Sequence, residues 1–295
     1  MADADILKTL LSVVEKGGFL ADSMIHDSKP SLKPDQSVLT RADKAVSELV
    51  RDSLKGFLAT GEHALVDEED PGSAQLFGPV MSGAYQYVWS LDPIDGTRAY
   101  SNQMPVYGVS LGVLRDGQPW MGAVFFPSLR EFYYCNGPEA FFVRNAFTPS
   151  ASEQRIGPLD QDITPQSVFL SSDHFLRRYR WDTAFCQIMM PTVAVVELCW
   201  PAIGRGCGSY FEANFWDFAG AWPVFRAAGL DLRCCKTGQV LDRLRRDAFI
   251  GKGPKTWRMS GDYILSSSRN YPLIKKHIKP FPAWLKVAWK AVPMM

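Results

Sequence analysis

A nine-residue string at positions 89–97, WSLDPIDGT, constrains this chain more than any other feature. It has the pattern of a hydrophobic strand that ends in two aspartates separated by Pro-Ile. Because Pro93 fixes its own φ and biases Asp92 to an extended conformation, the side chains of Asp92 and Asp95 can face one point beyond the strand end. Two carboxylates at such a short distance repel each other. A hard divalent cation such as Mg²⁺, which prefers oxygen ligands, relieves the repulsion.

The end of the same string favours a phosphate beside that cation. Gly96-Thr97 lets a phosphate approach the backbone closely, and the amides at such a turn or helix start can donate to it. The structural alternative is a plain turn after a strand, with Asp95 capping its own backbone. The whole string favours the metal and phosphate interpretation over the turn.

Composition excludes several other classes of protein. The 295 residues are 46% hydrophobic and 21% charged, which is typical of a folded chain. The net charge of +1 produces no strong overall field that would attract a nucleic acid. Apolar stretches are too short to span a bilayer, so we expect no membrane insertion and a cytoplasmic location. Six cysteines without CxxC pairs fit a reducing compartment. Four scattered histidines offer little support for a histidine base, so carboxylates are expected to carry any chemistry.

Periodicity predicts two helices and then a β-meander in the first half. Apolar residues from Ile6 to Val14 recur at helical spacing before Gly17-Gly18, and a second helix opens at Thr40 and ends near Gly56. Strands are expected at 87–91, 107–114 and 120–126, with a tight turn at 116–117.

The second half alternates strand and helix. We expect a strand at 167–171, a buried helix at 193–203, a helix at 215–228 that Pro223 kinks or delays, and a last short strand at 248–251. These elements predict one domain, 1–268, with lobes of about 1–150 and 151–268. Residues 269–295 form a basic and aromatic tail, which is expected to pack on the domain rather than bind a membrane or a partner.

Three motifs together resemble the inositol monophosphatase family. The string at 89–97 is similar to the family's first signature, WDFAG at 216–220 to its second, and Glu68-Glu69 to its upstream acidic pair, in the family's order. The resemblance runs from about Lys33 to about Gly253. It implies an α/β (α+β) fold, a layered αβαβα sandwich shared with fructose bisphosphatases. It also implies Mg²⁺-dependent, often lithium-sensitive hydrolysis of small phosphate monoesters, and homodimers are common among such proteins.

The resemblance also implies the roles of the site residues. Two or three Mg²⁺ ions would be held by four carboxylates and one carbonyl, with one metal activating a water and another stabilising the leaving oxygen. The implied ligands are Glu68, Asp92, Asp95, Asp217 and the Ile94 carbonyl. Gly96 and Thr97 would bind the phosphate, Glu68, Asp43 and Thr97 would act in catalysis, and Glu69 would lie behind the ligands.

Two of these assignments keep a structural alternative. Thr40 to Asp43 is close to a helix-capping box, so Asp43 needs no catalytic role, and Asp217 taken alone is more often a helix cap. Asp67 replaces the glycine usual before the acidic pair, and is expected to strengthen cation binding or to face solvent.

Departures in the substrate-binding half leave the substrate open. Thr192-Val193 stands where the family often has Gly-Ser, and Glu212 resembles an inositol-contacting glutamate at a shorter spacing to Asp217. Inositol monophosphate or a similar polyol phosphate is the first expectation. Alternatives are a 3′(2′),5′-bisphosphate nucleotidase, a histidinol-phosphate phosphatase and a fructose-1,6-bisphosphatase. A non-catalytic relative would show loss of a ligand carboxylate or of Thr97, and neither is lost.

Overall fold

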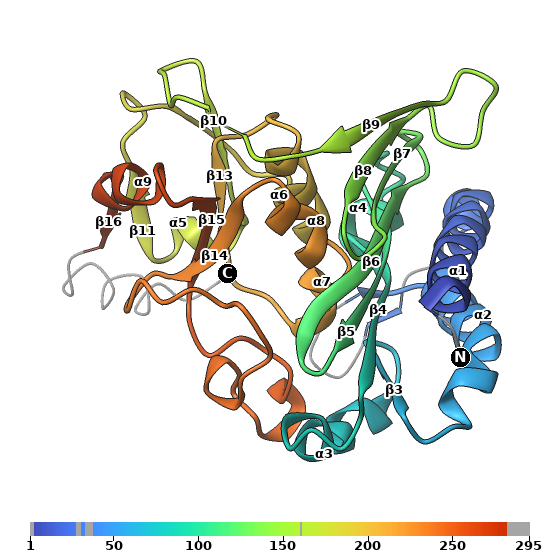
Figure 1. The fold of residues 1–295 in the computed structure, drawn as a ribbon. Coiled ribbons are helices and arrows are strands. Elements are labelled where there is room, and N and C mark those ends of the chain that lie inside the picture. The colour runs from blue at the N-terminus through green and yellow to red at the C-terminus, as the bar shows by residue number, and fades with distance from the viewer. Residues whose placement is uncertain (1–2, 28–30, 33–37, 160, 282–295) are drawn as a thin grey trace.

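The described part of the computed structural model, residues 3–27, 31–32, 38–159 and 161–281, forms five layers in the order αβαβα (Figure 1). Helices α1 (Asp3–Met24) and α2 (Arg41–Leu58) cover the outer face of the first sheet. Helices α6 (Ala194–Ala202), α7 (Phe215–Ala219) and α8 (Trp222–Ala227) lie between the two sheets. Helices α5 (Asp173–Leu176) and α9 (Tyr271–His277) pack on the far side of the second sheet. The predicted layered sandwich is confirmed.

The first sheet contains seven strands within the described residues, in sequence order across the sheet. β3 and β4 are parallel and every later pair is antiparallel, so the predicted meander is confirmed. It continues through three strands that the sequence analysis did not foresee. The strands are β3 (His63–Asp67), β4 (Tyr87–Asp95), β5 (Gly108–Arg115), β6 (Gln118–Phe126), β7 (Glu131–Cys135), β8 (Ala140–Arg144) and β9 (Ser152–Ile156).

Helix α1 continues through Gly17-Gly18, where the sequence predicted its end. The reason is a close approach to the sheet: a Cβ on Gly18 would lie 2.1 Å from Cδ1 of the fully buried Phe125. Glycine here is therefore a packing requirement and not a helix stop, because only a residue without a side chain lets α1 lie this near the Phe125 ring.

The helix predicted at 215–228 divides into α7 and α8. Pro223 lies in the first turn of α8, where its missing amide costs no hydrogen bond, so the late start is the version confirmed. Between the two helices the backbone touches the sheet: a Cβ on Gly112 would lie 2.3 Å from the Ala219 carbonyl oxygen, and one on Gly220 2.4 Å from Ser110 Oγ. This backbone contact fixes α7 against β4 and β5.

The second sheet contains five described strands in the order β12-β10-β13-β15-β14, with parallel pairs around β10 and antiparallel pairs around β15. Its strands are β10 (Val168–Leu170), β12 (Gln187–Met189), β13 (Gly208–Phe211), β14 (Leu230–Cys234) and β15 (Tyr263–Ser267). The strand predicted at 248–251 is wrong. Residues Arg246–Ala248 form a 3-10 turn and Phe249 makes only an isolated bridge, because its side chain is buried in a hydrophobic cluster between irregular segments.

Smaller elements complete the described chain. They are α3 (Phe77–Met81), α4 (Thr97–Ser101), the pairs β1 (Ser31–Leu32) with β2 (Val38–Leu39) and β11 (Tyr179–Trp181) with β16 (Ile278–Pro280), and four 3-10 turns including η2 (Pro71–Leu76) and η4 (Gly253–Lys255). Of the predicted tail, residues 271–280 form α9 and β16, and 282–295 lie outside the described residues.

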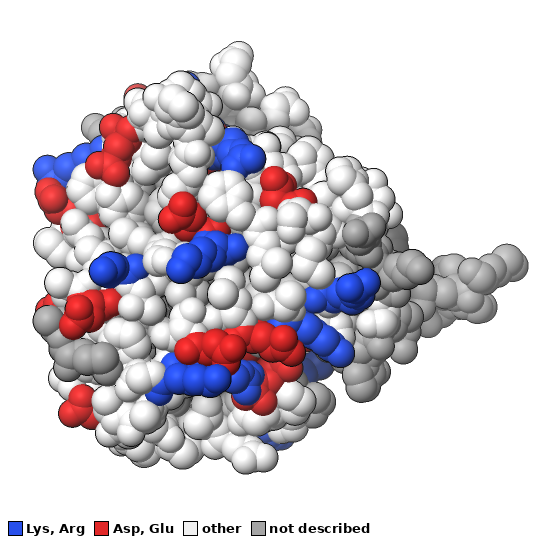
Figure 2. All heavy atoms as spheres, turned by 90° about the vertical axis from the view of Figure 1, so that its right-hand side faces the viewer, with Lys and Arg blue, Asp and Glu red and all other residues white. Residues whose placement is uncertain are grey.

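The surface view agrees with the balanced charge of the sequence. On the face that carries α1 and α2, basic and acidic side chains lie interspersed and form no patch of one sign (Figure 2). None of the helices in the described ranges has the length and apolar character needed to span a bilayer.

The close approach at Gly18 predicts opposite effects for one substitution at two helical glycines. Gly18→Ala should lower the free energy of unfolding by about 1–3 kcal/mol, because the new methyl group overpacks the Phe125 ring. Gly56→Ala on α2, where nothing lies within 4 Å, should raise it by about 0.5–1 kcal/mol. Urea denaturation measures both, and equal effects of the two substitutions would contradict the packing explanation.

Candidate active site

Three carboxylates from distant parts of the sequence meet at the end of β4. β3 and β4 run parallel with Asp67 opposite Leu91, so Glu68 and Asp92, each one residue further, emerge at the same sheet edge. Asp217 reaches them from the first turn of α7, which the backbone contact at Gly112 and Gly220 holds against the sheet. Carboxylate oxygens of Glu68, Asp92 and Asp217 lie within 4.8 Å of one another.

A β-bulge brings Asp95 to the same corner. Asp92 pairs with Ser110 and Asp95 with Gly108, so three steps along β4 oppose two along β5. The extra residue re-aims the strand end, as bulges do next to functional sites. Asp95 is buried, and its Oδ2 accepts a hydrogen bond of 3.1 Å from the Val195 amide in the first turn of α6.

The cluster holds like charges away from water. Burial raises the pKa of Asp92 well above its usual value, and the charges of Glu68, Asp95 and Asp217 add to the shift. Burial, followed by the charge of Glu68, raises the pKa of Asp217 to about 7. Among the described residues no hydrogen-bond partner reaches Asp92 Oδ1. An all-oxygen donor set with an unsatisfied buried oxygen suits a divalent cation such as Mg²⁺.

The turn after the bulge forms the edge of a cavity of about 310 Å³. Gly96 has φ 86°, a left-handed conformation that favours glycine, and it leads directly into α4. The Thr97 hydroxyl donates to the Ile94 carbonyl at 2.9 Å. Ile94, Gly96 and Thr97 thus line the cavity together with the carboxylates.

Asp43 occupies the capping position that the sequence allowed. Its Oδ2 accepts hydrogen bonds from the Thr40 amide at 2.7 Å and from the Thr40 hydroxyl at 2.6 Å, which completes a capping box on α2. The same buried carboxylate is near enough to the cluster for its charge to contribute to the raised pKa of Asp92. Its catalytic role stays a prediction.

Asp67 does not face solvent, contrary to one of its two expectations; that its charge strengthens cation binding stays a prediction. Its side chain is fully buried and accepts hydrogen bonds from Ser47 and Arg51 of α2. It also receives the Glu69 amide at 2.9 Å, which places Glu69 in the turn directly after Glu68. Asp67 therefore ties β3 to α2 and fixes the backbone from which Glu68 projects.

Glu212 lines the same cavity, but its carboxylate is already ion-paired. Arg178 Nη1 lies 2.7 Å from Glu212 Oε2, and Arg258 Nη2 lies 2.8 Å from Glu212 Oε1. Burial acts to raise the pKa of Glu212, but Arg258 and Arg178 outweigh burial and hold the pKa below its usual value. A polyol hydroxyl would have to compete with two guanidinium groups for these oxygens.

Several polar side chains that line the cavity were not predicted from the sequence, among them His174, Glu197 and Arg258. His174 follows the polar residues after β10, and polar residues at the carboxyl end of a parallel strand were the available signal. Glu197 is a single charge inside the apolar run of α6. It is buried, and burial raises its pKa well above its usual value.

Thr192 and Val193, which stand where the family often has Gly-Ser, have a structural role. Thr192 has φ 54°, a left-handed conformation that is uncommon for a β-branched residue. Val193 packs over the turn, since a Cβ on Gly96 would lie 3.0 Å from its Cγ2. The pair therefore holds α6 against the turn at Gly96.

Comparisons with known proteins agree with this geometry. The model of the inositol monophosphatase family matches residues 5–280. A fructose-1,6-bisphosphatase/inositol-1-monophosphatase of Aquifex aeolicus is 26% identical over 67% of this chain and 72% of its own length. A 3′(2′),5′-bisphosphate nucleotidase CysQ of Salmonella typhimurium is 24% identical over 84% and 98%.

Solved structures show the same fold. A dual specific IMPase/NADP phosphatase bound with D-inositol-1-phosphate superimposes with a TM-score of 0.72 at 16% identity, covering 95% of this chain and all of that chain. A Thermotoga maritima IMPase gives 0.67 at 18% identity, covering 92% and 96%. Because the family model matches residues 5–280 of this chain, the chain belongs to the inositol monophosphatase family and is a phosphoric monoester hydrolase.

Proposed function

We propose that this chain hydrolyses a small phosphate monoester with Mg²⁺ at the carboxylate cluster. The observation that carries the proposal is the meeting of Glu68, Asp92 and Asp217 within 4.8 Å, with the pKa of Asp92 raised and its Oδ1 unsatisfied within the described chain. These three, with Asp95 and the Ile94 carbonyl, would hold two or three ions. Bound Mg²⁺ would supply Lewis acidity toward the water and the phosphoryl group.

The chain's own residues would then position the reactants. The turn at Gly96 and Thr97 faces the cavity and would present its amides to the phosphate. Glu68 is partly exposed, and with Thr97 it would orient the attacking water along the line of the ester bond. Asp43, held by Thr40 at the start of α2, would polarise the Thr97 hydroxyl that orients this water.

The organic group of the phosphate ester defines which substrate is hydrolysed. Inositol monophosphate and similar polyol phosphates remain the first substrates to test, together with histidinol phosphate. A bisphosphate nucleotidase activity is the second candidate, since Arg178 and Arg258 place positive charge where a polyol-binding glutamate would otherwise stand free. Similarity to CysQ over 98% of that protein's length also supports it. Inhibition by Li⁺ is expected in either case.

Removal of one cluster carboxylate should abolish most activity. Asp92→Asn should lower kcat by about two to three orders of magnitude, the usual effect of losing one strong electrostatic group in a catalytic site. Release of inorganic phosphate measures it, with Mg²⁺ and after chelation by EDTA. The matched control is Asp52→Asn, an exposed carboxylate on α2, which should leave kcat unchanged. A folded wild-type protein with no more turnover than Asp92→Asn would contradict the proposal.

The crowded carboxylates also predict a pH-dependent stability without metal. The pKa of Asp217 is about 7 in the folded protein against an ordinary 3.8, so folding favours its protonated form. The contribution of Asp217 to the free energy of unfolding is fully present below about pH 4 and is lost as the pH rises through about 7. In EDTA, Asp217→Asn should therefore gain stability relative to wild type between pH 5 and pH 8.

Thermal unfolding at the two pH values measures this difference, with Asp242→Asn as an exposed control. Adding Mg²⁺ at pH 8 should stabilise the wild type more than Asp217→Asn. A parallel pH dependence of wild type and Asp217→Asn in EDTA would rule out the electrostatic strain.

A further inference from the structure

Glu197 lines the catalytic cavity but has no part in the reaction proposed above. It is the single charged residue among the nine of α6, and only 3% of its surface is exposed. Ala194, three residues earlier on the same helix face, lines the cavity with it. No hydrogen bond from the described residues reaches Glu197 Oε1. A buried carboxyl group without a partner is costly, and a hydrogen bond from a bound molecule would remove that cost.

The surroundings of Glu197 join the metal site to the segment after β10. Burial raises the pKa of its carboxyl group well above the usual value, and the charges of Asp95, Asp217 and Asp173 add to the shift in that order. Asp95 and Asp217 belong to the carboxylate cluster, whereas Asp173 begins α5. The cavity holds only about 310 Å³, so an organic group attached to a phosphate at the cluster would occupy the space beside Glu197.

A second unsatisfied oxygen lines the same cavity. Ser172 lies directly before Asp173, at the N-cap of α5, and its hydroxyl oxygen is buried with no hydrogen-bond partner among the described residues. Ser172 and Glu197 come from different elements, and neither side chain is cationic. Together they suit a neutral hydrogen-bonding group better than an anion.

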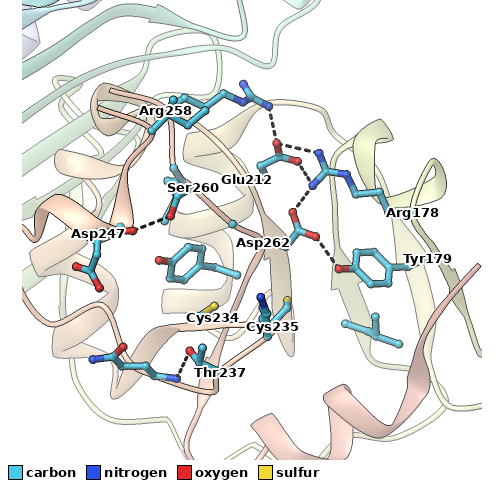
Figure 3. A pocket seen from close by; sticks show the side chains of 18 of the residues that line it. Arg178, Tyr179, Glu212, Cys234, Cys235, Thr237, Asp247, Arg258, Ser260 and Asp262 are labelled. Carbon is cyan, nitrogen blue, oxygen red and sulfur yellow. Dashed lines mark hydrogen bonds and ion pairs between the residues drawn. The ribbon is translucent and has the colours of Figure 1, made fainter. Parts of the chain in front are cut away.

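Glu212, the other glutamate of the cavity, is not available for such a contact. Figure 3 shows its carboxylate between Arg258 and Arg178, with Asp262 paired to Arg178 in turn. Because both oxygens of Glu212 are engaged by arginine, a hydroxyl group would have to displace a guanidinium group to reach them. A contact with Glu197 requires no such exchange.

We infer that Glu197 is a specificity-determining residue, which hydrogen-bonds a hydroxyl group carried by the organic part of the substrate close to the ester bond. The inference deepens the proposed function and rests on it. A hydroxyl group suits both protonation states of Glu197, because it donates to a carboxylate and accepts from a carboxylic acid. An ester without this hydroxyl would leave Glu197 unsatisfied and would therefore be a poorer substrate.

The test compares esters that differ only in their hydroxyl groups. Inositol 1-phosphate is paired with cyclohexyl phosphate, and adenosine 3′-monophosphate with 2′-deoxyadenosine 3′-monophosphate. Release of inorganic phosphate at saturating Mg²⁺ gives the ratio of kcat/KM within each pair. In the pair that wild type hydrolyses faster, the ester with the hydroxyl group should be favoured by at least about tenfold.

Three variants separate recognition of the hydroxyl group from other effects. Glu197→Met keeps the length of the side chain but removes both oxygens, and it should lower the ratio by about tenfold. Glu197→Gln keeps hydrogen-bonding groups at the same position and should retain most of the ratio. The control Glu48→Met makes the same exchange at an exposed residue of α2 that does not line the catalytic cavity, and it should leave the ratio unchanged.

An unchanged ratio in Glu197→Met would overturn the inference, even if activity on both esters fell equally, because Glu197 would then act on the metal site or on the fold alone. A ratio of about one in wild type for both pairs would overturn it as well. Thermal unfolding checks that Glu197→Met is folded. If it is not, Glu197→Asp, which withdraws the carboxyl group by one methylene, should lower the ratio in its place, and an unchanged ratio there refutes the inference.

Failure of the proposed function would look different, because wild type would then hydrolyse none of the four esters. Calorimetric binding of the same esters with Mg²⁺ would give the ratio within each pair as a ratio of Kd values. A ratio that favours the hydroxyl-bearing ester in wild type and falls in Glu197→Met supports the role of Glu197. Equal ratios in the two proteins refute it.

Discussion

The structure depends on one unfavourable interaction, the repulsion among carboxylates that the fold forces together at the end of β4. Two features impose it. The bulge between Asp92 and Asp95 directs both side chains to one corner, and the contact of Gly220 with β5 brings Asp217 in from α7. Burial of Asp92 and its unsatisfied oxygen make the arrangement costly without a counter-ion. Such a site is suited to binding divalent cations and the phosphate group that accompanies them.

Three acidic residues near the site make structural hydrogen bonds. Asp43 caps α2, Asp95 accepts from the start of α6, and Asp67 ties β3 to α2. Helix starts and strand ends thus converge on one point. Asp43 is fixed by Thr40 of its own helix start, whereas Asp95 and Asp67 are fixed by hydrogen bonds from the neighbouring helices α6 and α2. The fold therefore holds the geometry of the cluster before any ion binds, which is the preorganisation that electrostatic catalysis requires.

Local patterns in the sequence predicted the first two helices, the β-meander and the cation site at Asp92 and Asp95. The αβαβα layers, and the addition of Glu68 and Asp217 to that site, were implied only by the resemblance of three motifs to the inositol monophosphatase family. Features set by contacts between distant segments were not predictable. The sequence predicts a helix end at Gly18 because the contact with Phe125 is not visible in it. It predicts a strand at 248–251 because it does not show that Ala248 and Phe249 pack into a hydrophobic cluster. Likewise, the pairing of Glu212 with Arg178 and Arg258 joins residues more than thirty positions apart.

The central claim is that the three carboxylates share divalent ions. The most direct measurement is a crystal structure of the protein grown with Mn²⁺ in place of Mg²⁺, with anomalous scattering used to locate the ions. The account predicts anomalous peaks within coordination distance of Glu68, Asp92 and Asp217, and their loss from crystals of Asp92→Asn. Saturating Mn²⁺ that binds elsewhere, or no peak among these three carboxylates, would contradict it.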